Sequence, residues 1–593
     1  MCGIVGYIGY DSSKEIILNG LQKLEYRGYD SAGIALFEDN NVEIIKSVGR
    51  IANLEEQLSN QTHTFGIGHT RWATHGVPNK SNSHPHHSQS KLITLVHNGV
   101  IENYKELKDE YLKDYTFYSQ TDTEVLSNLI EKFVLDGMSM EEALQKLIEV
   151  VDGSYALAII NKDINDKMFV AKNKSPILVG IGEGFNMLGS DALAMNMKTS
   201  NVLEINDKEF GVLTRNNVCL YDANGLEISR DSFRISIDAS ESEKGIFDHY
   251  MLKEIYDQST VIRKIISEYL PNGDVNIDRD ILKMFEDSNV IRIIAAGTSY
   301  YSGLVSQSLL ERFIGKPVLV HVASEFAYDT PIVNENDLCV FISQSGETAD
   351  LRSALVKVKE LGLKTFTITN VEGSTLSREA DCSMLLHAGR EIAVASTKAF
   401  TAQLSVLAIL GYSLSDKKYD LYTELSKAAS IIENVIEGRE VVSEIVKKNL
   451  LNTEHCFVLG RGVDYKASLE GALKLKEISY IHTEGMSSGE LKHGTIALIE
   501  EGTPTIFLIT QGNIALNTRS NIMEVEARGA NVITIVNGKY ASESDDLVFD
   551  EISDELAPMI GVVYMQLISY YTALYLEKDI DMPRNLAKSV TVE

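Results

Sequence analysis

The chain has 593 residues, too many for a single hydrophobic core, and roughly three or four domains are expected. Hydrophobic residues make up 44% of the chain and charged residues 23%, as in ordinary globular proteins. The formal net charge of −29 argues against nucleic acid or an anionic membrane as a main partner.

Cysteine usage indicates a reduced, cytoplasmic protein rather than a disulfide framework. The five cysteines are far apart and form no Cys-x-x-Cys pair: Cys2, Cys219, Cys339, Cys382 and Cys456. Charged residues at positions 11, 14 and 15 interrupt any apolar run near the start, so no signal peptide is expected.

The chain begins Met1-Cys2-Gly3-Ile4. Removal of Met1 would leave a thiol and a free α-amine on one residue. Ordinary pKa values of about 8.5 for the thiol and about 7.7–8.0 for the amine allow the amine to act as base for its own nucleophile. Position alone leaves two interpretations open: a self-activated nucleophile, or an ordinary second residue.

Residues 1–238 alternate short apolar runs with turns, which is typical of a strand-rich layered domain. Such runs occupy 4–8, 32–37, 92–96 and 156–160. Helical patterns occupy 122–135 and 139–150. The polar, acidic segment 238–244 has no apolar period and predicts a linker, assigned to 239–250. The first domain is therefore placed at 2–238.

Seven of the thirteen histidines lie between residues 63 and 97. No carboxylate or cysteine joins His84-Pro85-His86-His87 at ligand spacing, so no metal site is expected. The nearby pair Asn98-Gly99 lies between apolar runs, which is a hairpin-turn signal. It could instead form an oxyanion hole from the Asn98 amide and the Gly99 N–H. The residues alone leave both interpretations open.

After about residue 280 a pattern of strand, glycine loop and helix occurs twice. Residues 293–300 align with 458–465, and 352–370 align with 519–537 without a gap. Each copy predicts a doubly wound domain around a parallel sheet. The two domains are assigned to residues 251–450 and 451–580.

In the first copy, Ser343-Gln344-Ser345-Gly346-Glu347-Thr348 separates an apolar strand from a helix. Hydroxyls and backbone N–H groups at a helix N-terminus can bind an anion without net positive charge. A helix cap with a capping box is the simpler explanation, but three hydroxyls exceed what capping requires. The second copy has Thr510-Gln511-Gly512-Asn513-Ile514-Ala515 and lacks two of them. One phosphate site, in the first copy, is predicted.

Several residues near the C-terminus have ordinary explanations when taken singly. Glu470, Lys474 and Glu477 share one helical face, which is typical of a solvated salt-bridge face. His493 lies on a glycine-flanked loop, and Lys588 lies in a tail that would normally be disordered.

The stretch 557–576 carries no charge over twenty residues. Its proline, glycine, glutamine and four tyrosines would be poorly tolerated by a lipid-facing helix. A buried helix in the core or at a subunit interface is predicted, and no membrane association.

Together these motifs resemble those of the glutamine–fructose-6-phosphate aminotransferase (isomerizing) family, of bacterial type, over essentially the whole chain. That family joins a class II glutamine amidotransferase domain, of N-terminal-nucleophile αββα fold, to two sugar isomerase domains. The matching motifs are MCGIVGYIG, LEYRGYDSAG (24–33), HTRWATHG (69–76), HNGVIEN (97–103), TDTEV (121–125), GTSY, SQSGET, VASTKAF (394–400), LEGALKLKEISYI (469–481), GELKHG and the terminal PRNLAKSVTVE.

The resemblance implies that Cys2 attacks the glutamine amide with its own α-amine as base. Asn98 and Gly99 would form the oxyanion hole. Glutamine would be bound by Arg71, Trp72, Thr74, His75 and Asp122. Among these, Arg71 would hold the α-carboxylate and Asp122 the α-ammonium. Trp72 would also help gate a channel that carries ammonia to the second site.

In the second site, the resemblance implies that Lys588, in a tail of residues 581–593, forms a Schiff base with the C2 ketone of fructose 6-phosphate. Ammonia would then replace the lysine. His493 would assist ring opening, and Glu477 would move the proton between C1 and C2. The remaining sugar-phosphate-binding residues would be Lys474, Glu470, Ser299, Ser343, Gln344, Ser345 and Thr348.

The implied reaction converts fructose 6-phosphate and glutamine into glucosamine 6-phosphate and glutamate, the first step toward UDP-N-acetylglucosamine. No cofactor is expected, and a homodimer is expected. Bacterial relatives commonly carry cysteine where this chain has Ala296, which puts a role for that cysteine in doubt here. The short linker resembles that of bacterial-type members and predicts no feedback by UDP-N-acetylglucosamine.

Other glutamine amidotransferases fit less well. Amidophosphoribosyltransferase would need an acidic diphosphosugar motif and asparagine synthetase a Ser-Gly-Gly loop, and the sequence has neither. An amidotransferase acting on a different sugar phosphate remains an alternative. A non-catalytic sugar-phosphate sensor would need an output module, and would not need Cys2, Glu477, His493 and Lys588 together.

Overall fold

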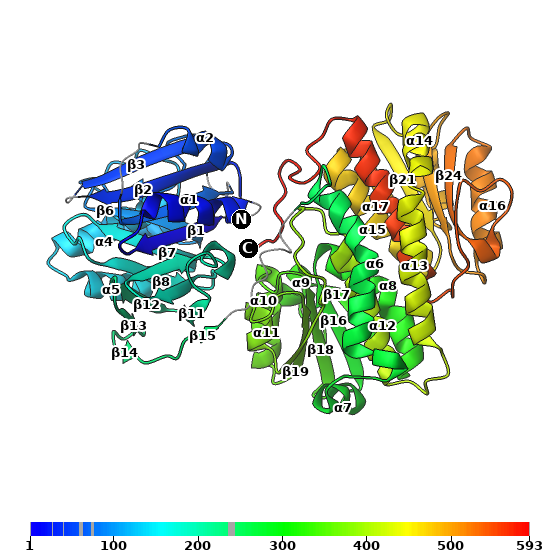
Figure 1. Ribbon diagram of the computed structural model, residues 1–593, viewed down its shortest axis with the longest axis horizontal. Coiled ribbons are helices and arrows are strands. Elements are labelled where there is room, and N and C mark those ends of the chain that lie inside the picture. Colours follow the sequence, from blue (N-terminus) through cyan, green and yellow to red (C-terminus); the bar gives the residue numbers. More distant parts are fainter. Residues whose placement is uncertain are drawn as a thin grey trace. The chain divides into compact units, whose positions relative to one another are not determined.

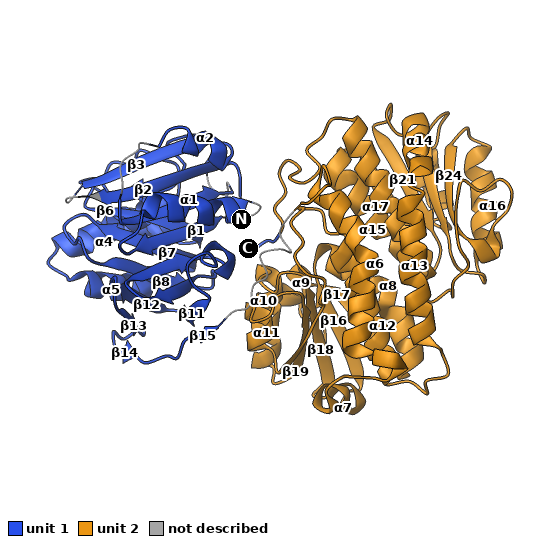
Figure 2. Ribbon diagram, viewed as in Figure 1, with its two compact units in different colours: residues 1–239, 589–593 blue, residues 240–588 orange. Residues whose placement is uncertain are grey.

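The computed structural model describes residues 2–25, 28–38, 41–58, 63–72, 76–234 and 244–591. The chain divides into two compact units, residues 1–239 with 589–593 and residues 240–588 (Figures 1 and 2). Residues 239–243 of the predicted linker fall outside the described residues.

Within its described residues the first unit forms two antiparallel sheets. The strands of one are β1 Gly3–Ile8, β2 Ser31–Glu38, β3 Asn41–Val48, β4 Phe65–Arg71, β9 Leu178–Gly182, β10 Phe185–Gly189, β11 Asn201–Glu204 and β15 Phe233–Arg234. Their order is β15-β11-β9-β10-β1-β4-β2-β3. The strands of the other are β5 His86–His87, β6 Ile93–Ile101, β7 Gly153–Asn161, β8 Met168–Asn173, β12 Glu209–Leu213, β13 Val218–Tyr221 and β14 Glu227–Ile228. Their order is β14-β13-β12-β8-β7-β6-β5.

Alternating side chains along these strands build three apolar layers. In β1, Ile4 and Ile8 lie in the core between the two sheets, whereas Val5 and Tyr7 pack against α1 (Ser13–Leu24). The other helices of the unit are α2 Ile51–Glu55, α3 Tyr104–Tyr111, α4 Thr123–Leu135 and α5 Met140–Val150. The last three cover the outer face of the second sheet. This αββα arrangement confirms the expected N-terminal-nucleophile fold.

The second unit contains two parallel five-stranded sheets. The first is built from β16 Val290–Ala295, β17 Val318–Val322, β18 Asp337–Ser343, β19 Lys364–Thr369 and β20 Cys382–Leu385. The second is built from β21 His455–Gly460, β22 His482–Ser487, β23 Pro504–Ile509, β24 Asn531–Asn537 and β25 Leu547–Phe549. Their orders, β17-β16-β18-β19-β20 and β22-β21-β23-β24-β25, are identical strand for strand. The predicted repeat of one doubly wound α/β unit is confirmed.

Helices shared by both copies fill the space between the two sheets (Figure 1). The helices of this unit are α6 Tyr250–Tyr269, α7 Arg279–Asp287, α8 Gly297–Ile314, α9 Ala323–Tyr328, α10 Ala349–Glu360, α11 Thr375–Glu379, α12 Lys398–Ser413, α13 Leu421–Glu437, α14 Glu440–Asn449, α15 Val463–Ser479, α16 Ala515–Glu526 and α17 Ala557–Tyr575. One core joins α6, α8, α12, α13, α15 and α17. Separate cores attach α9 and α10 to the first sheet and α16 to the second.

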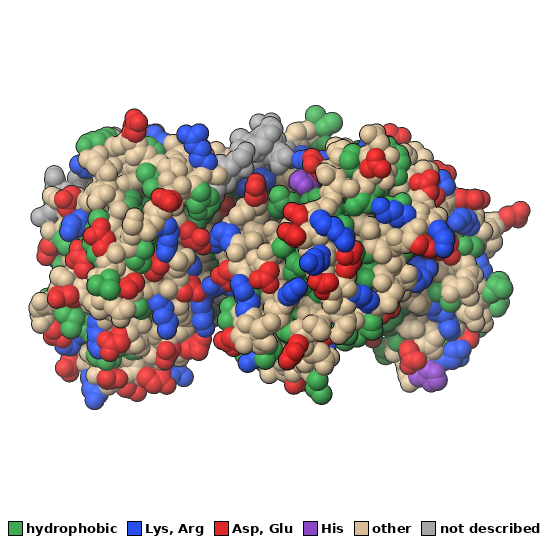
Figure 3. All heavy atoms as spheres, turned by 90° about the horizontal axis from the view of Figure 1, so that it is seen from below, with side chains coloured by type: hydrophobic (Ala, Val, Ile, Leu, Met, Phe, Trp, Pro, Cys, Tyr) green, Lys and Arg blue, Asp and Glu red, His purple; other side chains and the backbone are tan. Residues whose placement is uncertain are grey.

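Helix α17 contains the uncharged stretch of the sequence and is buried along nearly its whole length. It packs against α15, which carries three of the expected site residues. Across the described ranges, no helix combines the length and hydropathy needed to cross a bilayer. On the face seen in Figure 3, acidic and basic side chains are interspersed without a broad basic patch.

In each copy the first and third strands of the repeat are neighbours, and the chain leaves them in opposite lateral directions. Ligands of doubly wound sheets bind beyond the carboxyl ends of the strands at such a switch point. In the first copy this edge carries the Gly297 loop after β16 and the Ser343–Thr348 loop after β18.

Candidate active sites

Cys2 lies where two paired strands meet. Pairing of β1 with β4 sets Gly3 opposite Thr70, which brings Cys2 beside the end of β4. The Trp72 N–H donates to Cys2 Sγ at 3.2 Å. Burial raises the pKa of the Cys2 thiol, while the Trp72 N–H and the Arg71 guanidinium act in the opposite direction. The hydrogen bond to sulfur favours the thiolate, which is the nucleophilic form.

The Asn98-Gly99 pair lies inside β6, opposite Ala156 and Tyr155 of β7, so the hairpin-turn interpretation is wrong. Asn98 Nδ2 donates to the Cys2 carbonyl oxygen at 3.0 Å. Gly99 has φ of 140°, and a Cβ there would lie 2.0 Å from the backbone oxygen of Ser154. Strand β6 therefore presents an amide beside Cys2 at a point where only glycine can follow.

Two buried groups of opposite charge lie near Cys2. Arg71 ends β4, and its Nη2 donates to the Gly76 carbonyl at 3.3 Å. Asp122 directly precedes α4, and its Oδ2 accepts from the Ile101 N–H at 2.9 Å. Burial lowers the pKa of Arg71, and the charges of Cys2 and Asp122 oppose that shift, so the three groups are close enough to interact.

The remaining expected glutamine-binding residues are Trp72, Thr74 and His75. The Trp72 ring packs edge-on against Tyr29, with centroids 5.8 Å apart. Thr74 and His75 lie outside the described residues. Within the part of the chain that is described, no group of three or more His, Cys, Asp or Glu side chains has the arrangement of a metal site.

The Ser343–Thr348 loop brings the hydroxyls of Ser343 and Thr348 together. Ser343 Oγ lies 3.1 Å from Thr348 Oγ1 and accepts from the Gly346 N–H at 3.0 Å. Ser345 Oγ accepts from the Glu347 N–H at 3.1 Å. The Thr348 side chain makes no cap hydrogen bond to the described α10, and Glu347 binds Thr375 instead. The capping-box interpretation is therefore wrong, and the hydroxyls ring one helix N-terminus.

The equivalent loop of the second copy is filled by the chain's own carboxylates. Asp464, which aligns with Ser299, accepts from the Thr510 N–H at 2.8 Å and from the Thr510 hydroxyl. Asp554 Oδ2 accepts from the Gly512 N–H at 2.9 Å. Carboxylates at these N–H groups occupy the position that an anion would take. This explains why only the first copy retains the full set of hydroxyls.

Glu470, Lys474 and Glu477 do not form a solvated face, so the salt-bridge-face interpretation is wrong. Lys474 is 1% exposed, and its Nζ lies 2.8 Å from Glu477 Oε2 and 3.5 Å from Glu470 Oε1. Lys474 Nζ also donates to Thr298 Oγ1, at 2.9 Å, on the Gly297 loop of the first copy. Burial raises the pKa of Glu470 to about 8. A helix of the second copy thus reaches the Gly297 loop of the first.

Lys588 is held inside the protein rather than in a disordered tail. Its side chain is 3% exposed, and Nζ donates to Glu391 Oε2 at 2.5 Å. Burial would raise the pKa of Glu391, but Lys588 outweighs it and holds the pKa at about 2. Glu391 also contributes to the raised pKa of Lys474, so the two clusters lie close together.

Two other expected residues have different surroundings. Ser299, in the first turn of α8, accepts a hydrogen bond from Gln403 Nε2 at 2.9 Å. His493 ends the short 3-10 turn Leu491–His493 and is exposed. Among the described residues, no hydrogen bond or ion pair joins the His493 side chain to Lys474, Glu477 or Lys588.

Four residues of these sites were missed by sequence reasoning: Thr298, Gln403, Glu391 and Glu254. Glu391 stands just before the VASTKAF motif, and that position was its only signal. Glu254 is buried, and its Oε1 accepts from the Ala393 N–H at 3.2 Å. Burial and the neighbouring Glu391 raise the pKa of Glu254 to about 8.

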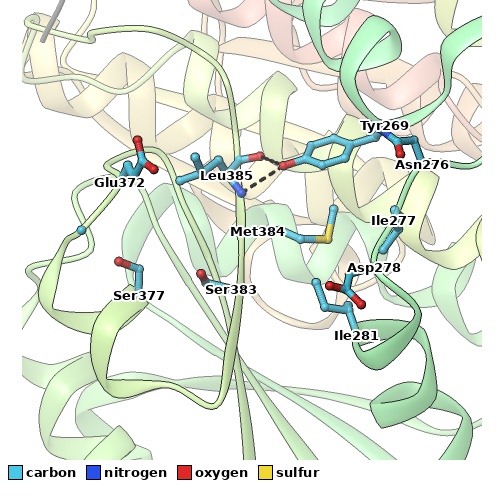
Figure 4. A pocket seen from close by; sticks show the side chains of 11 residues that line it. Tyr269, Asn276, Ile277, Asp278, Ile281, Glu372, Ser377, Ser383, Met384 and Leu385 are labelled. Atoms are coloured by element: carbon cyan, nitrogen blue, oxygen red, sulfur yellow. Dashed lines mark hydrogen bonds between the residues drawn. The ribbon is translucent and has the colours of Figure 1, made fainter. Parts of the chain in front are cut away.

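A separate pocket lies at the β20 edge of the first parallel sheet (Figure 4). Asp278 and Glu372 line it, and its described lining contains no lysine, arginine or histidine. The Tyr269 hydroxyl joins both backbone groups of Leu385 at its wall. A phosphate would meet two carboxylates here, so this pocket does not fit a sugar phosphate.

Comparison with known proteins agrees with this architecture. A SIS domain model matches residues 284–412 and 449–576, and a glutamine amidotransferase domain model matches residues 69–195. A solved structure titled as the C-terminal domain of glucosamine-fructose-6-phosphate aminotransferase from Francisella tularensis is 37% identical. It superposes with a TM-score of 0.55 and covers 58% of this chain and all of its own.

Full-length relatives are more similar still. The proteins named glutamine--fructose-6-phosphate aminotransferase [isomerizing] from Staphylococcus aureus (strain Mu50) and Staphylococcus epidermidis (strain ATCC 12228) are each 53% identical to this chain. Both alignments extend over 601 positions and cover 100% of either sequence. Since identity at this level spans both units, the chain belongs to the glutamine–fructose-6-phosphate aminotransferase (isomerizing) family.

Proposed function

We propose that this protein converts glutamine and fructose 6-phosphate into glutamate and glucosamine 6-phosphate. The observation that carries the proposal is the buried amine of Lys588, which is paired with Glu391. The charge of Glu391 also acts on Lys474, which contacts the Gly297 loop at the sheet edge that carries the hydroxyl-rich Ser343–Thr348 loop. A ketose phosphate fits this combination, because the loop binds its phosphate and the amine condenses with its carbonyl.

The first half-reaction takes place at Cys2. Once Met1 is removed, the free α-amine accepts the thiol proton and the thiolate attacks the glutamine side-chain amide. Asn98 and the Gly99 N–H stabilise the oxyanion that forms. Collapse of this intermediate releases ammonia and leaves a thioester, which water hydrolyses to glutamate.

Recognition of glutamine rests on its two charged groups. Arg71 binds the α-carboxylate and Asp122 the α-ammonium, since the two side chains carry the complementary charges. Trp72, Thr74 and His75 complete the glutamine site. The ammonia released there passes through a channel in which Trp72 takes part. It is consumed by the reaction in the second unit.

The second half-reaction begins with the phosphate bound by Ser299, Ser343, Gln344, Ser345 and Thr348. His493 assists opening of the sugar ring. Lys588 then condenses with the C2 ketone to give an iminium and water, and ammonia displaces the lysine. Glu477 transfers a proton from C1 to C2, beside Lys474 and Glu470, which converts the ketose imine into the amino aldose.

The test is incubation with glutamine and fructose 6-phosphate while glutamate and glucosamine 6-phosphate are measured. Both products are expected in equal amounts. Glutamate without amino sugar would refute the acceptor assignment and favour a different sugar phosphate. Cys2→Ala should abolish use of glutamine, and full activity in that variant would refute the nucleophile. A cytoplasmic homodimer is proposed as the working form, tested by light scattering.

A further inference from the structure

Four histidine rings are buried on and beside β6, the strand that carries Asn98 and Gly99. They come from β4, β5, β6 and the segment before β5: His69, His86, His97 and His84, each at most 5% exposed. The rings of His69 and His84 stack with centroids 4.1 Å apart and planes 13° from parallel. Burial lowers the pKa of His69 to about 3, so the ring is neutral at physiological pH. None of these rings has a role in the proposed chemistry.

The hydrogen bonds of His69 define its tautomer. Nε2 lies 3.0 Å from the backbone oxygen of His97 and 3.0 Å from Asn98 Oδ1. A backbone carbonyl oxygen can only accept, so Nε2 must carry the proton. The same N–H then faces Asn98 and requires an acceptor there. The carbonyl end of the Asn98 amide meets this requirement.

The other end of the Asn98 amide is constrained independently. Nδ2 donates to the Cys2 carbonyl oxygen at 3.0 Å, and that oxygen can only accept. A flipped amide would set NH₂ against the His69 N–H and oxygen against oxygen at Cys2. Both contacts would be repulsive, so His69 and Cys2 together allow one orientation of Asn98.

His84 keeps the His69 ring in place. Its ring stacks on His69, and its Nδ1 accepts from the His97 N–H at 3.2 Å. Its Nε2 lies 3.4 Å from Thr123 Oγ1 at the start of α4. The strand that carries Asn98 therefore also fixes the ring that supports His69.

We propose that His69 is a positioning residue for glutamine hydrolysis: its Nε2–H, shared between His97 O and Asn98 Oδ1, directs the Asn98 NH₂ group toward Cys2 and the oxyanion. This inference rests on the proposed role of Asn98. During attack the amide needs no rotation, because the donor already points to the correct side, which is the condition for preorganised stabilisation. His69 itself contacts neither the thiol nor glutamine.

The test is a double-mutant cycle in the full-length protein, measuring glutamine hydrolysis. His69→Phe keeps a flat ring but removes the donor. It is expected to lower kcat about 10- to 100-fold and to change KM for glutamine less than about 3-fold, a smaller loss than the roughly 10²–10³-fold that follows removal of an oxyanion donor itself. His69→Gln, whose Nε2 can reach the same position, should recover most of the rate.

The second arm of the cycle uses Asn98→Ala. If His69 acts through Asn98, His69→Phe should cost less than about 3-fold in the Asn98→Ala background, because coupled residues are non-additive. An equal loss in both backgrounds would overturn the proposal. A normal rate in Asn98→Ala alone would instead refute the role proposed for Asn98, so the two failures are distinct.

A matched control is His86, a buried histidine of the same cluster that contacts Thr121 and Tyr118 rather than Asn98. His86→Gln should show additive effects with Asn98→Ala. If the His69→Phe variant does not fold, the rates of glutamine hydrolysis of His69→Gln and His69→Asn are compared instead. Only Gln extends its donor to the position of Nε2, and equal rates in these two variants would overturn the proposal.

Discussion

Lys588 donates to Glu391 across 197 residues of sequence, at an Nζ–Oε2 distance of 2.5 Å, and both side chains are almost fully buried. Glu391 is itself fixed. Its Oε1 accepts from the backbone N–H groups of Thr397 and Ala399, at 2.8 and 3.1 Å. The Ser396 hydroxyl donates to Oε2 at 2.6 Å. The carboxylate is thus a rigid counter-ion for whatever cation Lys588 carries.

Replacing this counter-ion should impair Schiff-base formation. The Lys588 nitrogen is positively charged both as the free ammonium and as the iminium. The Glu391→Gln substitution therefore removes the negative counter-ion of both forms. Removing one member of a buried pair costs about 3–5 kcal/mol. Reductive trapping of fructose 6-phosphate on Lys588 with borohydride should fall at least about 10-fold. Ser396→Ala, which leaves the ion pair intact, is the control, and undiminished trapping in Glu391→Gln would contradict the assignment.

The hydroxyl loop should control affinity for the sugar phosphate rather than the chemical step. Ser345→Ala and Thr348→Val each remove one hydrogen bond to a charged group, worth about 1.5–3 kcal/mol. The KM for fructose 6-phosphate should rise about 10- to 100-fold, with a smaller change in kcat. Asn513→Ala, at the exposed loop of the second copy, is the matched control. Steady-state kinetics that show equal KM shifts in all three variants would refute the phosphate site.

The repeated α/β unit and the strand-rich layers of the first domain could be predicted from the residues because both depend on local sequence pattern, whereas the αββα arrangement was implied by the family resemblance. Short apolar runs at 4–8 and 156–160, bounded by turns, predict strands, and the aligned glycine loops predict two copies of one topology. The uncharged stretch 557–576 could likewise be assigned to the interior from its composition.

What could not be predicted depends on tertiary packing. The spacing of Glu470, Lys474 and Glu477 is the same for a solvated face and for a buried cluster, and only contact with Thr298 distinguishes them. Asn98-Gly99 has a hairpin composition, yet pairing with β7 keeps it within a strand. The role of Glu391 could not be predicted from its neighbours in the sequence, because its ion-pair partner, Lys588, lies 197 residues further along the chain.

The carboxylates in the second copy's loop should contribute to stability rather than to catalysis. Asp464→Ala would leave the Thr510 N–H and hydroxyl buried without an acceptor, at a cost of about 1–3 kcal/mol. Asp464→Asn keeps an acceptor of the same shape and should lose less. Urea denaturation of the two variants measures the difference. Equal stability of the Ala and Asn variants would contradict this role.

Glu254 should make the stability of the second unit depend on pH. Its pKa is raised from 4.5 to about 8 in the folded protein, so the folded state retains a proton that the unfolded chain has released between these values. The stabilisation is fully present below pH 4.5 and is lost as the pH rises through about 8. Between these limits the free energy of unfolding should fall by about 1.4 kcal/mol per pH unit on account of this group.

Glu254→Gln isolates this effect. The amide stays neutral at every pH and keeps an oxygen that can accept from the Ala393 N–H. Guanidinium denaturation at pH 5.5, 6.5 and 7.5 should therefore show the stability of the unsubstituted protein falling relative to the variant with each step. Glu424→Gln, at a partly exposed carboxylate that accepts from the Ser553 N–H, is the control for removal of a carboxylate elsewhere in the second unit. Parallel pH profiles for the Glu254→Gln variant and the unsubstituted protein would mean that Glu254 is ionised in the folded state.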